Sequence, residues 1–427
     1  MLLKSDLVNF LFLIGFAVFG YGNYIGQVDG LSEGLIVSSM AFMAIILFYL
    51  IDTLYRKRVG YELTGTYWLG LTYIVTLIVS LIVALRGGIP GVNPGNLLLS
   101  SVLVLSSFNA AVIVLFYNRG DPDFDFAKLF LKALGVLLLV NVLGFALGMH
   151  GEGHNIEGRV NLPFFRGIYH GAHILSVFCL MLVFYLRDPL RDPVRYFILL
   201  SIMLGGVVLM LGINSRLSFL VFALLLVIIV TKAARVIKGL YTLSLFTLPL
   251  LLSFALLVYQ ILSLPVFVAI LKRVDKEDVT TFNGRSYLWA SVGEWAWNDR
   301  TGLLFGNGFK GHYKLGLLEL VAKMWDQPHA YNMHTHSTFT EVAVAQGVFG
   351  VLLLYVLFWR GFKFFRSNYI EDTKLAPMFG GFLYLLFIWQ IDIVCYHTDI
   401  GHAVLFAMLA PLAIKGPWTS TKRPMVG

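Results

Sequence analysis

Apolar residues occupy long continuous runs along this chain, and short polar stretches separate them. A helix that crosses the hydrocarbon core of a bilayer needs about 20 such residues. The runs predict twelve membrane-spanning helices, near residues 7–25, 34–54, 65–85, 97–117, 129–149, 167–186, 196–213, 216–232, 241–263, 337–359, 376–396 and 400–415. The seventh and eighth runs are nearly continuous, and Asn214, Ser215 and Arg216 supply the break between them. Because apolar and polar residues do not alternate within these runs, the runs favour helices over the strands of a membrane barrel.

Composition strengthens this interpretation. Hydrophobic residues make up 58% of the 427 residues and charged residues only 13%, against about 25% charged in soluble domains. Such a chain has too few polar groups to cover a water-facing surface. This composition excludes soluble, disordered and fibrous proteins. We expect a single all-α integral membrane domain over residues 1–427. Cys179 and Cys395 are too few for a disulfide framework. No cleavable signal peptide is expected, since Lys4 and Asp6 precede the first run and no small-residue cleavage site is evident.

The distribution of Lys and Arg predicts the orientation. With both termini in the cytoplasm and residues 264–336 left out, twenty basic residues face the cytoplasm and four face outwards. The outward four are Arg86, Arg159, Arg166 and Arg216. By the positive-inside rule, we expect a multi-pass protein of the bacterial inner membrane. The net charge of +8 then needs no nucleic-acid partner.

Two predicted external segments are longer than the other loops, residues 149–166 and residues 264–336. Ser286–Trp297 and Leu315–Trp325 show the apolar spacing of short helices. We expect these helices to lie on the membrane surface. Four tryptophans would then lie at headgroup level: Trp289, Trp295, Trp297 and Trp325.

External arginines are scarce, so each calls for an explanation. An Arg in hydrocarbon costs roughly 2.5–3.5 kcal/mol at a helix centre, and Arg216 begins a span directly after an apolar run. Its guanidinium either snorkels to the interface or faces an anion inside the bundle, where its planar fork suits a phosphate. Arg285 follows Gly284 at the start of a predicted helix. That place suits a phosphate, although a solvated loop Arg has the same pattern.

Histidines cluster just before the tenth span, at His329, His334 and His336. Alternate histidines in an extended segment can bind a metal, but no carboxylate or cysteine lies nearby at matching spacing. A general base is the better hypothesis, because an imidazole accepts a proton near neutral pH. A helix-capping or interfacial histidine is the structural alternative.

Further polar groups gather on the same predicted side. Residues 149–173 hold His154, Arg159, Arg166, His170 and His173, which indicates an anionic ligand there. Asp392, His397, Asp399 and His402 surround the last external junction, where they line the same cavity or form the turn.

Acidic residues that could bind a metal occur in two predicted loops. Asp121, Asp123 and Asp125 are predicted on the cytoplasmic side, away from the other candidates, and a solvated loop explains them better. No paired acidic motif occurs near Asp29 and Glu33, which argues against a metal-dependent membrane glycosyltransferase.

Three late stretches carry a family resemblance: Thr281–Trp289 (TFNGRSYLW), Leu304–Phe309 (LFGNGF) and His336–Gly350, in which Gly347 follows His336 by eleven residues. Together with Ser215-Arg216 at the start of a span, their order resembles the O-antigen ligase/polymerase superfamily. That superfamily includes the lipopolysaccharide O-antigen ligase and the Wzy-type O-antigen and exopolysaccharide polymerases. Ser337 stands where the family has Asn, and Tyr169–His173 replaces its xPN segment.

The resemblance implies a GT-C-like fold and metal-independent, inverting glycosyl transfer on the periplasmic face, with no cofactor. The donor would be a glycan on undecaprenyl diphosphate, held by Arg216 and Arg285, and His336 would activate the acceptor hydroxyl. Arg159 and His334 are expected to contribute to substrate binding.

The activity within the family stays open between two alternatives. The NGRxxLW and LFGNGF runs favour a polymerase, whereas the run from Asn332 to His336 looks more like some ligases, which use lipid A-core as acceptor. Partners would be the glycan donor, the acceptor, membrane lipid and polysaccharide-assembly proteins. A lipid-linked glycan transporter is the alternative from another class. It should show internal repeats and broken helices at the midplane, whereas here the polar residues gather at one face.

Overall fold

Helices account for all the regular elements that the computed structural model describes. The described residues are 4–56, 62–151, 159–167, 169–186, 189–190, 192–249, 285–324 and 330–416. Among them, seven helices are long and apolar enough to cross a membrane. These are α1 (Lys4–Val28), α2 (Leu31–Arg56), α3 (Gly65–Arg86), α4 (Pro94–Asn118), α5 (Phe126–Ala146), α7 (Pro193–Ile213) and α19 (Thr338–Ile370).

Four shorter apolar helices complete the main body of the described chain. They are α6 (His170–Leu182), which the 3₁₀ turn η1 (Val183–Tyr185) continues, α8 (Arg216–Val230), α20 (Ala376–Ile388) and α21 (Ile400–Ala413). The expectation of an all-helical, multi-pass membrane protein agrees with these elements. The predicted ninth span, 241–263, lies mostly outside the described residues; α10 (Leu240–Leu245) covers its start.

The predicted break between the seventh and eighth runs is present. Asn214 ends α7 in the left-handed conformation, with φ of 57°. Asn tolerates this conformation better than most residues because its short polar side chain bonds locally. Ser215 occupies the N-cap position of α8, and Arg216 is its first residue. The interruption that the polar triplet suggested is therefore a helix stop followed at once by a helix start.

The predicted span 376–396 is wrong at its end, because α20 stops at Ile388. Thirteen residues of α-helix rise only about 20 Å, less than the ~30 Å of a bilayer core. Every residue of α20 is buried within the protein. The residues after Ile388 leave the helix and bond to other segments: Ile391 O accepts from Arg285 Nη1 at 2.8 Å, and Gln390 Oε1 accepts from the Leu248 amide at 3.3 Å. Non-helical backbone at membrane depth is tolerated where protein surrounds it.

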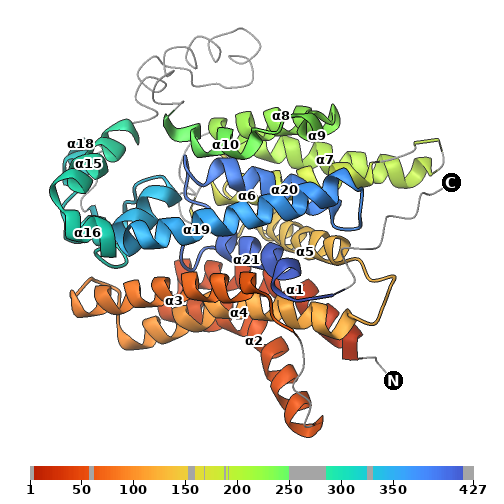
Figure 1. The fold of residues 1–427 in the computed structure, drawn as a ribbon, viewed down its shortest axis with the longest axis horizontal. Coiled ribbons are helices and arrows are strands. Elements are labelled where there is room, and N and C mark those ends of the chain that lie inside the picture. The colour runs from red at the N-terminus through yellow and green to blue at the C-terminus, as the bar shows by residue number, and fades with distance from the viewer. Residues whose placement is uncertain are drawn as a thin grey trace.

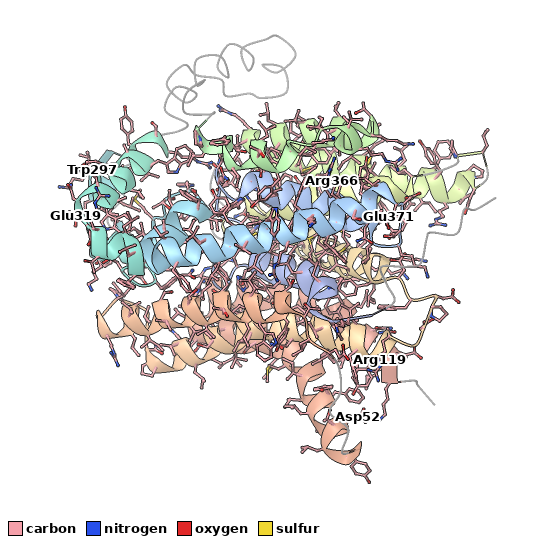
Figure 2. The ribbon with its side chains drawn as sticks, in the orientation of Figure 1. Asp52, Arg119, Trp297, Glu319, Arg366 and Glu371 are labelled. Carbon is pink, nitrogen blue, oxygen red and sulfur yellow. The ribbon has the colours of Figure 1, made fainter. Side chains whose placement is uncertain are left out.

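Most of the helices run side by side along one direction, and α2 projects from them at a steep angle, as Figure 1 shows. In that view α1–α4 form one side, α19, α20, α21, α5 and α6 lie in the middle, and α7, α8, α9 (Ala233–Val236) and α10 form the other side. Four short helices gather at one end of the bundle: α15 (Arg285–Asn298), α16 (Arg300–Phe305), α17 (Gly311–Lys314) and α18 (Glu319–Met324). Figure 2 places Trp297 and Glu319 at that end, and Arg366 and Glu371 towards the other.

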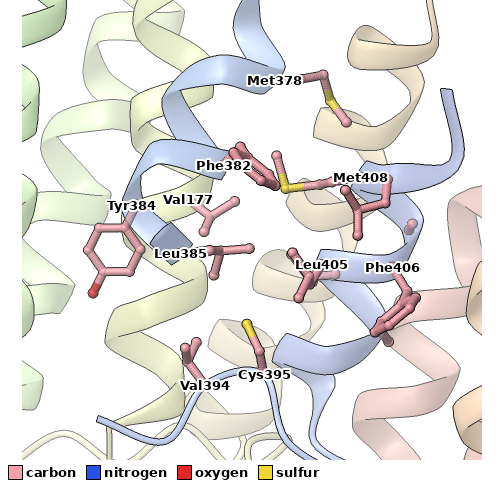
Figure 3. Close-up of a cluster of buried hydrophobic side chains, with 14 of the residues drawn as sticks. Val177, Met378, Phe382, Tyr384, Leu385, Val394, Cys395, Leu405, Phe406 and Met408 are labelled. Atoms are coloured by element: carbon pink, nitrogen blue, oxygen red, sulfur yellow. The ribbon is translucent and has the colours of Figure 1, made fainter. Parts of the chain in front are cut away.

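The core lies where α6, α20 and α21 meet (Figure 3). Val177, Phe382, Leu385, Leu405 and Met408 are part of it, from all three helices. Helices that are apolar on all sides belong in such a position, and every residue of α21 is buried. Cys179 and Cys395 are buried free thiols, as packing residues would be.

The LFGNGF segment docks onto a kink in α19. Gly347 interrupts that helix with φ of 70° and ψ of −173°, and a Cβ there would lie 2.3 Å from the Leu304 oxygen. The interruption frees two carbonyl groups of α19: Val344 O accepts from the Asn307 amide at 2.7 Å, and Ala345 O from the Gly308 amide at 3.1 Å. Two motifs far apart in the sequence therefore form one joint.

The predicted tryptophan belt is wrong for two of its four members. Trp289 and Trp295 are buried within the protein, at 7% and 6% exposed. Trp289 Nε1 donates to the Thr335 oxygen at 3.0 Å, so this indole anchors α15 to another segment. Trp297 is 74% exposed, and Trp325 lies outside the described residues. The predicted short helices are present as α15 and α18, the second of which begins at Glu319 instead of Leu315.

Candidate functional site

Asp392 is the point where four elements meet. Its Oδ2 lies 3.4 Å from Nη2 of Arg285, the first residue of α15, and 3.5 Å from Nε2 of His173 on α6. Its backbone oxygen accepts from both the amide and the hydroxyl of Thr338, which begins α19, at 3.2 Å each. Arg285 also donates from Nη1 to the Ile391 oxygen at 2.8 Å. The segment after α20 therefore fixes the guanidinium of Arg285 with two directed hydrogen bonds.

Tyr169 brings a second arginine to the same place. The guanidinium carbons of Arg159 and Arg285 each lie 5.8 Å from the centroid of its ring. Arg159 Nη1 also donates to the Tyr169 hydroxyl at 3.1 Å. Arg159 Nε is buried, and it has no hydrogen-bond partner among the described residues. Two guanidinium groups on one ring beside a single carboxylate leave excess positive charge, which an anionic ligand would balance.

The start of α8 is connected to this cluster through His173. The Ser215 and Ser218 hydroxyl groups lie 2.6 Å apart, and Ser218 Oγ lies 3.2 Å from His173 Nδ1. The Tyr384 hydroxyl is 2.9 Å from the same nitrogen. His173 is fully buried and contacts Asp392 through its other nitrogen. The helical turn that contains Arg216 is thus tied to the carboxylate that holds Arg285.

The loop before α19 carries His334 and His336 and is held by buried Glu341. Glu341 Oε1 accepts from the Thr335 amide at 2.7 Å and from its hydroxyl at 3.2 Å. Its Oε2 lies 3.1 Å from Nδ1 of His312, a residue of α17. His312 Nε2 lies 3.0 Å from the Met333 oxygen, and since a carbonyl only accepts, this nitrogen carries a proton. Glu341 and His312 therefore hold the loop at Thr335 and at Met333.

His336 itself has an unusual backbone conformation. Its φ is 51°, a left-handed conformation that costs a non-glycine residue about 1–2 kcal/mol. Its amide donates to His334 Nδ1 at 3.2 Å, and the two rings lie 4.1 Å apart. The bonds to Glu341 hold the loop in this shape, so the imidazole is positioned by its surroundings.

The surroundings also keep both imidazoles neutral. Burial lowers the pKa of His336 well below its usual range, and the neighbouring His334 and the positive charge of Arg285 lower it further. Burial likewise lowers the pKa of His334, to about 4. Near pH 7 each ring therefore keeps a lone pair, which a general base requires.

A second cationic region adjoins the first. Lys310 Nζ lies 3.4 Å from the centroid of the Tyr331 ring and donates to the Tyr331 oxygen at 3.2 Å. Burial, and then the positive charge of Arg166, lower the pKa of Lys310 to about 8. Arg166 O contacts His170 Nδ1, and His170 Nε2 lies 3.2 Å from Asp399. Positive charge therefore extends from Arg285 past the start of α6 to the α16–α17 turn.

The structure brings Arg159, Arg285, His334 and His336 together and ties the turn of Arg216 to them. His154 and His329 lie outside the described residues. Of the last external junction, Asp392 and Asp399 pair with histidines of α6.

Sequence reasoning missed four contributors, namely Tyr169, Lys310, His312 and Glu341. Only Glu341 gave a signal, as a carboxylate in an apolar run five residues after His336. The acidic run at 121–125 forms a turn: Asp125 caps α5, accepting from the Lys128 amide at 2.9 Å.

No family model matches this chain, and no curated protein matches it in sequence. The site therefore has to be interpreted from its own chemistry. Its described part holds Arg159 and Arg285 on Tyr169, the imidazoles of His334 and His336, and two anchored carboxylates, Asp392 and Glu341. No three His, Cys, Asp or Glu residues of the described chain are grouped as metal ligands would be.

Proposed function

We propose that this protein is a glycosyltransferase that moves a glycan from a lipid-linked diphosphate, undecaprenyl diphosphate, to an acceptor sugar hydroxyl. The observation that carries the proposal is the convergence of Arg159 and Arg285 on Tyr169, beside a neutral His336. Guanidinium forks match phosphate oxygens bidentately. A neutral imidazole next to them can take the proton of an attacking hydroxyl.

The proposed reaction is a single displacement. The acceptor oxygen attacks the anomeric carbon, the bond from that carbon to the phosphate oxygen breaks, and its electron pair leaves with undecaprenyl diphosphate. The acceptor proton passes to His336. Negative charge grows on the leaving diphosphate, where preorganised donors lower the barrier most effectively. Arg285 is preorganised in this sense because Ile391 and Asp392 hold it.

Each group then has a role in this proposal. Three arginines hold the diphosphate: Arg285, Arg159 and Arg216. His336 is the base, and the ring of His334 packs against the ring of His336 and accepts a hydrogen bond from the His336 amide. The inversion of the anomeric centre follows from one displacement, and no carboxylate nucleophile is needed. The active site would face the periplasm, at the end of the bundle that carries α15–α18.

A polymerase is the preferred activity within this class, on the NGRxxLW and LFGNGF runs. The alternative is a ligase that transfers the glycan to lipid A-core. The positions of Arg166 and Lys310 favour the ligase alternative, because a cationic region beside the base would suit a phosphorylated acceptor. Gel analysis of a deletion strain separates the two. Loss of a polymerase leaves one repeat unit on lipid A-core, and loss of a ligase leaves none.

The experiment that tests the proposal is turnover by the purified protein in detergent. Incubation with undecaprenyl-diphosphate-linked glycan and acceptor should release undecaprenyl diphosphate, which chromatography measures. EDTA should leave the rate unchanged, because arginines supply the positive charge. Movement of the donor across a proteoliposome membrane without release would instead identify a transporter, and loss of activity on chelation, restored by one divalent ion, would exclude the metal-independent mechanism.

A further inference from the structure

A cavity opens at the opposite end of the bundle from the candidate site. Its volume is about 700 Å³. Trp359, Arg360 and Lys363 of α19 form one wall, and residues 64–66 and 411–416 form the other. Arg360 follows the start of α19 by 22 residues, which is roughly 30 Å of helix. This cavity is therefore separate from the cluster around Asp392.

The charge of this cavity is strongly positive. Arg360, Lys363 and Lys415 line it, and none of its described lining residues is acidic. Lys415 forms an exposed ion pair with Glu62 at 2.6 Å, so one of the three charges is balanced in solvent. Arg360 Nη1 donates to the Thr66 hydroxyl at 3.3 Å, which holds the guanidinium at the cavity wall. Two cations remain to face whatever occupies the space.

Backbone pairing keeps the opposite wall in place. The Thr64 amide donates to the Ala413 oxygen at 2.9 Å, and the Lys415 amide donates to the Glu62 oxygen at 3.1 Å. Between them Leu63 and Ile414 form an isolated antiparallel bridge. The Thr64 side chain caps α3, accepting from the Thr66 amide at 3.2 Å. Because the start of α3 and the end of α21 are joined in this way, a ligand would meet a preformed surface.

The lining is amphipathic. Trp359 is 48% exposed, and Lys363 Nζ lies 5.7 Å from the centroid of its ring. Phe364 and Leu412 add apolar surface beside the charges. Tryptophan is enriched at the membrane–water interface, where the stem of a lysine can lie along apolar surface while its ammonium reaches water. The cavity therefore combines a polar, cationic part with an apolar part, as a lipid requires.

We propose that this cavity binds an anionic glycerophospholipid, with its phosphate between Arg360 and Lys363 and its glycerol and upper acyl carbons against Trp359 and Leu412. Basic cavities between membrane helices bind anionic headgroups through charge-assisted hydrogen bonds. The volume suits a headgroup, because small-molecule sites are ~300–1,000 Å³. This site lies at the other end of the bundle from the proposed chemistry and does not depend on it.

The test is lipid binding by the full-length protein in dodecyl maltoside, measured by native mass spectrometry. Dioleoyl phosphatidylglycerol should bind more tightly than dioleoyl phosphatidylcholine. Arg360→Gln/Lys363→Gln should weaken phosphatidylglycerol binding by about 30-fold, the size expected for two lost phosphate-facing charges. The matched control is Lys128→Gln/Lys132→Gln, which removes two exposed cations of α5 outside the cavity and should change binding less than twofold.

Three results would overturn the proposal. Equal losses in the two double variants would mean that the lipid responds to general surface charge. Equal binding of the two lipids would mean that the cavity does not select an anion. Displacement of the lipid by millimolar glycerol 1-phosphate or inorganic phosphate would assign the site to a soluble anion. If the cavity variant elutes as aggregate, Lys363→Gln alone replaces it, and threefold or greater weakening is then expected.

Discussion

At the scale of single residues, the candidate site depends on how neighbours change ordinary side chains. His336 is held in a left-handed conformation and stays neutral because it is buried beside Arg285. Arg285 is fixed by Ile391 and Asp392. Neither property belongs to the residue type alone, so each can be tested by substitution.

Removal of the proposed base should stop the chemistry without unfolding the protein. His336→Ala should lower turnover by about 10²–10⁴-fold, the usual contribution of acid–base catalysis. His334→Ala should have a milder effect, because this ring supports His336 and does not take the proton. Undecaprenyl diphosphate release by protein of normal elution profile measures both. A normal rate in the His336 variant would rule out this residue as the base.

The pH profile should reflect the neutral imidazole. Because burial and positive neighbours lower the pKa of His336 below 6.5, the free enzyme keeps its base at pH 6.5. The acid limb of kcat/KM should therefore lie below pH 6.5. A bound diphosphate adds negative charge, which favours the imidazolium and raises the pKa. The acid limb of kcat should then lie at higher pH than that of kcat/KM, and the reverse order would contradict this assignment.

The arginines should not tolerate lysine. Arg285→Lys keeps the charge but cannot donate to both Ile391 and Asp392 as the fork does. Loss of one charge-assisted bond costs ~1.5–3 kcal/mol, so turnover should fall by about tenfold or more. Arg216→Lys should lower turnover to a similar extent. Arg300→Lys is the control, because its guanidinium packs over exposed Trp297.

Donor binding by the double variant Arg216→Lys/Arg285→Lys, compared with each single variant, tests whether Arg216 and Arg285 hold one ligand. Two groups on one diphosphate should show coupling, so their losses should not add. A monophosphate donor analogue should bind wild type more weakly and should be less sensitive to either substitution. Strictly additive losses would mean separate sites.

At the scale of elements, the joint between α19 and the α16–α17 turn controls the shape of the α15–α18 end. Gly347→Ala should destabilise the protein, because its Cβ would lie 2.3 Å from the Leu304 oxygen and its φ is 70°. The positive φ costs ~1–2 kcal/mol and overpacking ~1–3 kcal/mol. The thermal unfolding midpoint in detergent measures the effect. Gly205→Ala, in α7 with no atom within 4 Å of its Cβ, should not lower the midpoint.

At the scale of the whole molecule, the charge distribution predicts which end of the bundle faces outwards. In a variant that lacks Cys179 and Cys395, Glu319→Cys on α18 should react with an impermeant maleimide in intact spheroplasts. Glu371→Cys, after α19, should react only once the membrane is permeabilised. Both positions are exposed and lie towards opposite ends in Figure 2. The opposite pattern of labelling would invert the orientation.

Properties that depend on nearest neighbours along the chain could be predicted before the fold was known. Continuous apolar runs predict helices because backbone groups in lipid must pair within their own segment, and eleven of the twelve predicted runs overlap long or short apolar helices of the described chain. The stop at Asn214 and the start at Arg216 follow from local polar residues. His336 and Arg285 were candidates for the same local reason.

Only the tertiary structure decided what depends on contacts between distant segments. Gln390, just after the early end of α20, and the buried Trp289 bond to residues 142 and 46 positions away, which no local pattern reveals. Tyr169 joins Arg159 to Arg285, and Glu341 and His312 hold the loop of His336. Periodicity gives the character of each helix but not its neighbours, because a bundle of apolar helices can pack in many orders. Which cations converge is therefore fixed by packing, and with it the chemistry that the site can perform.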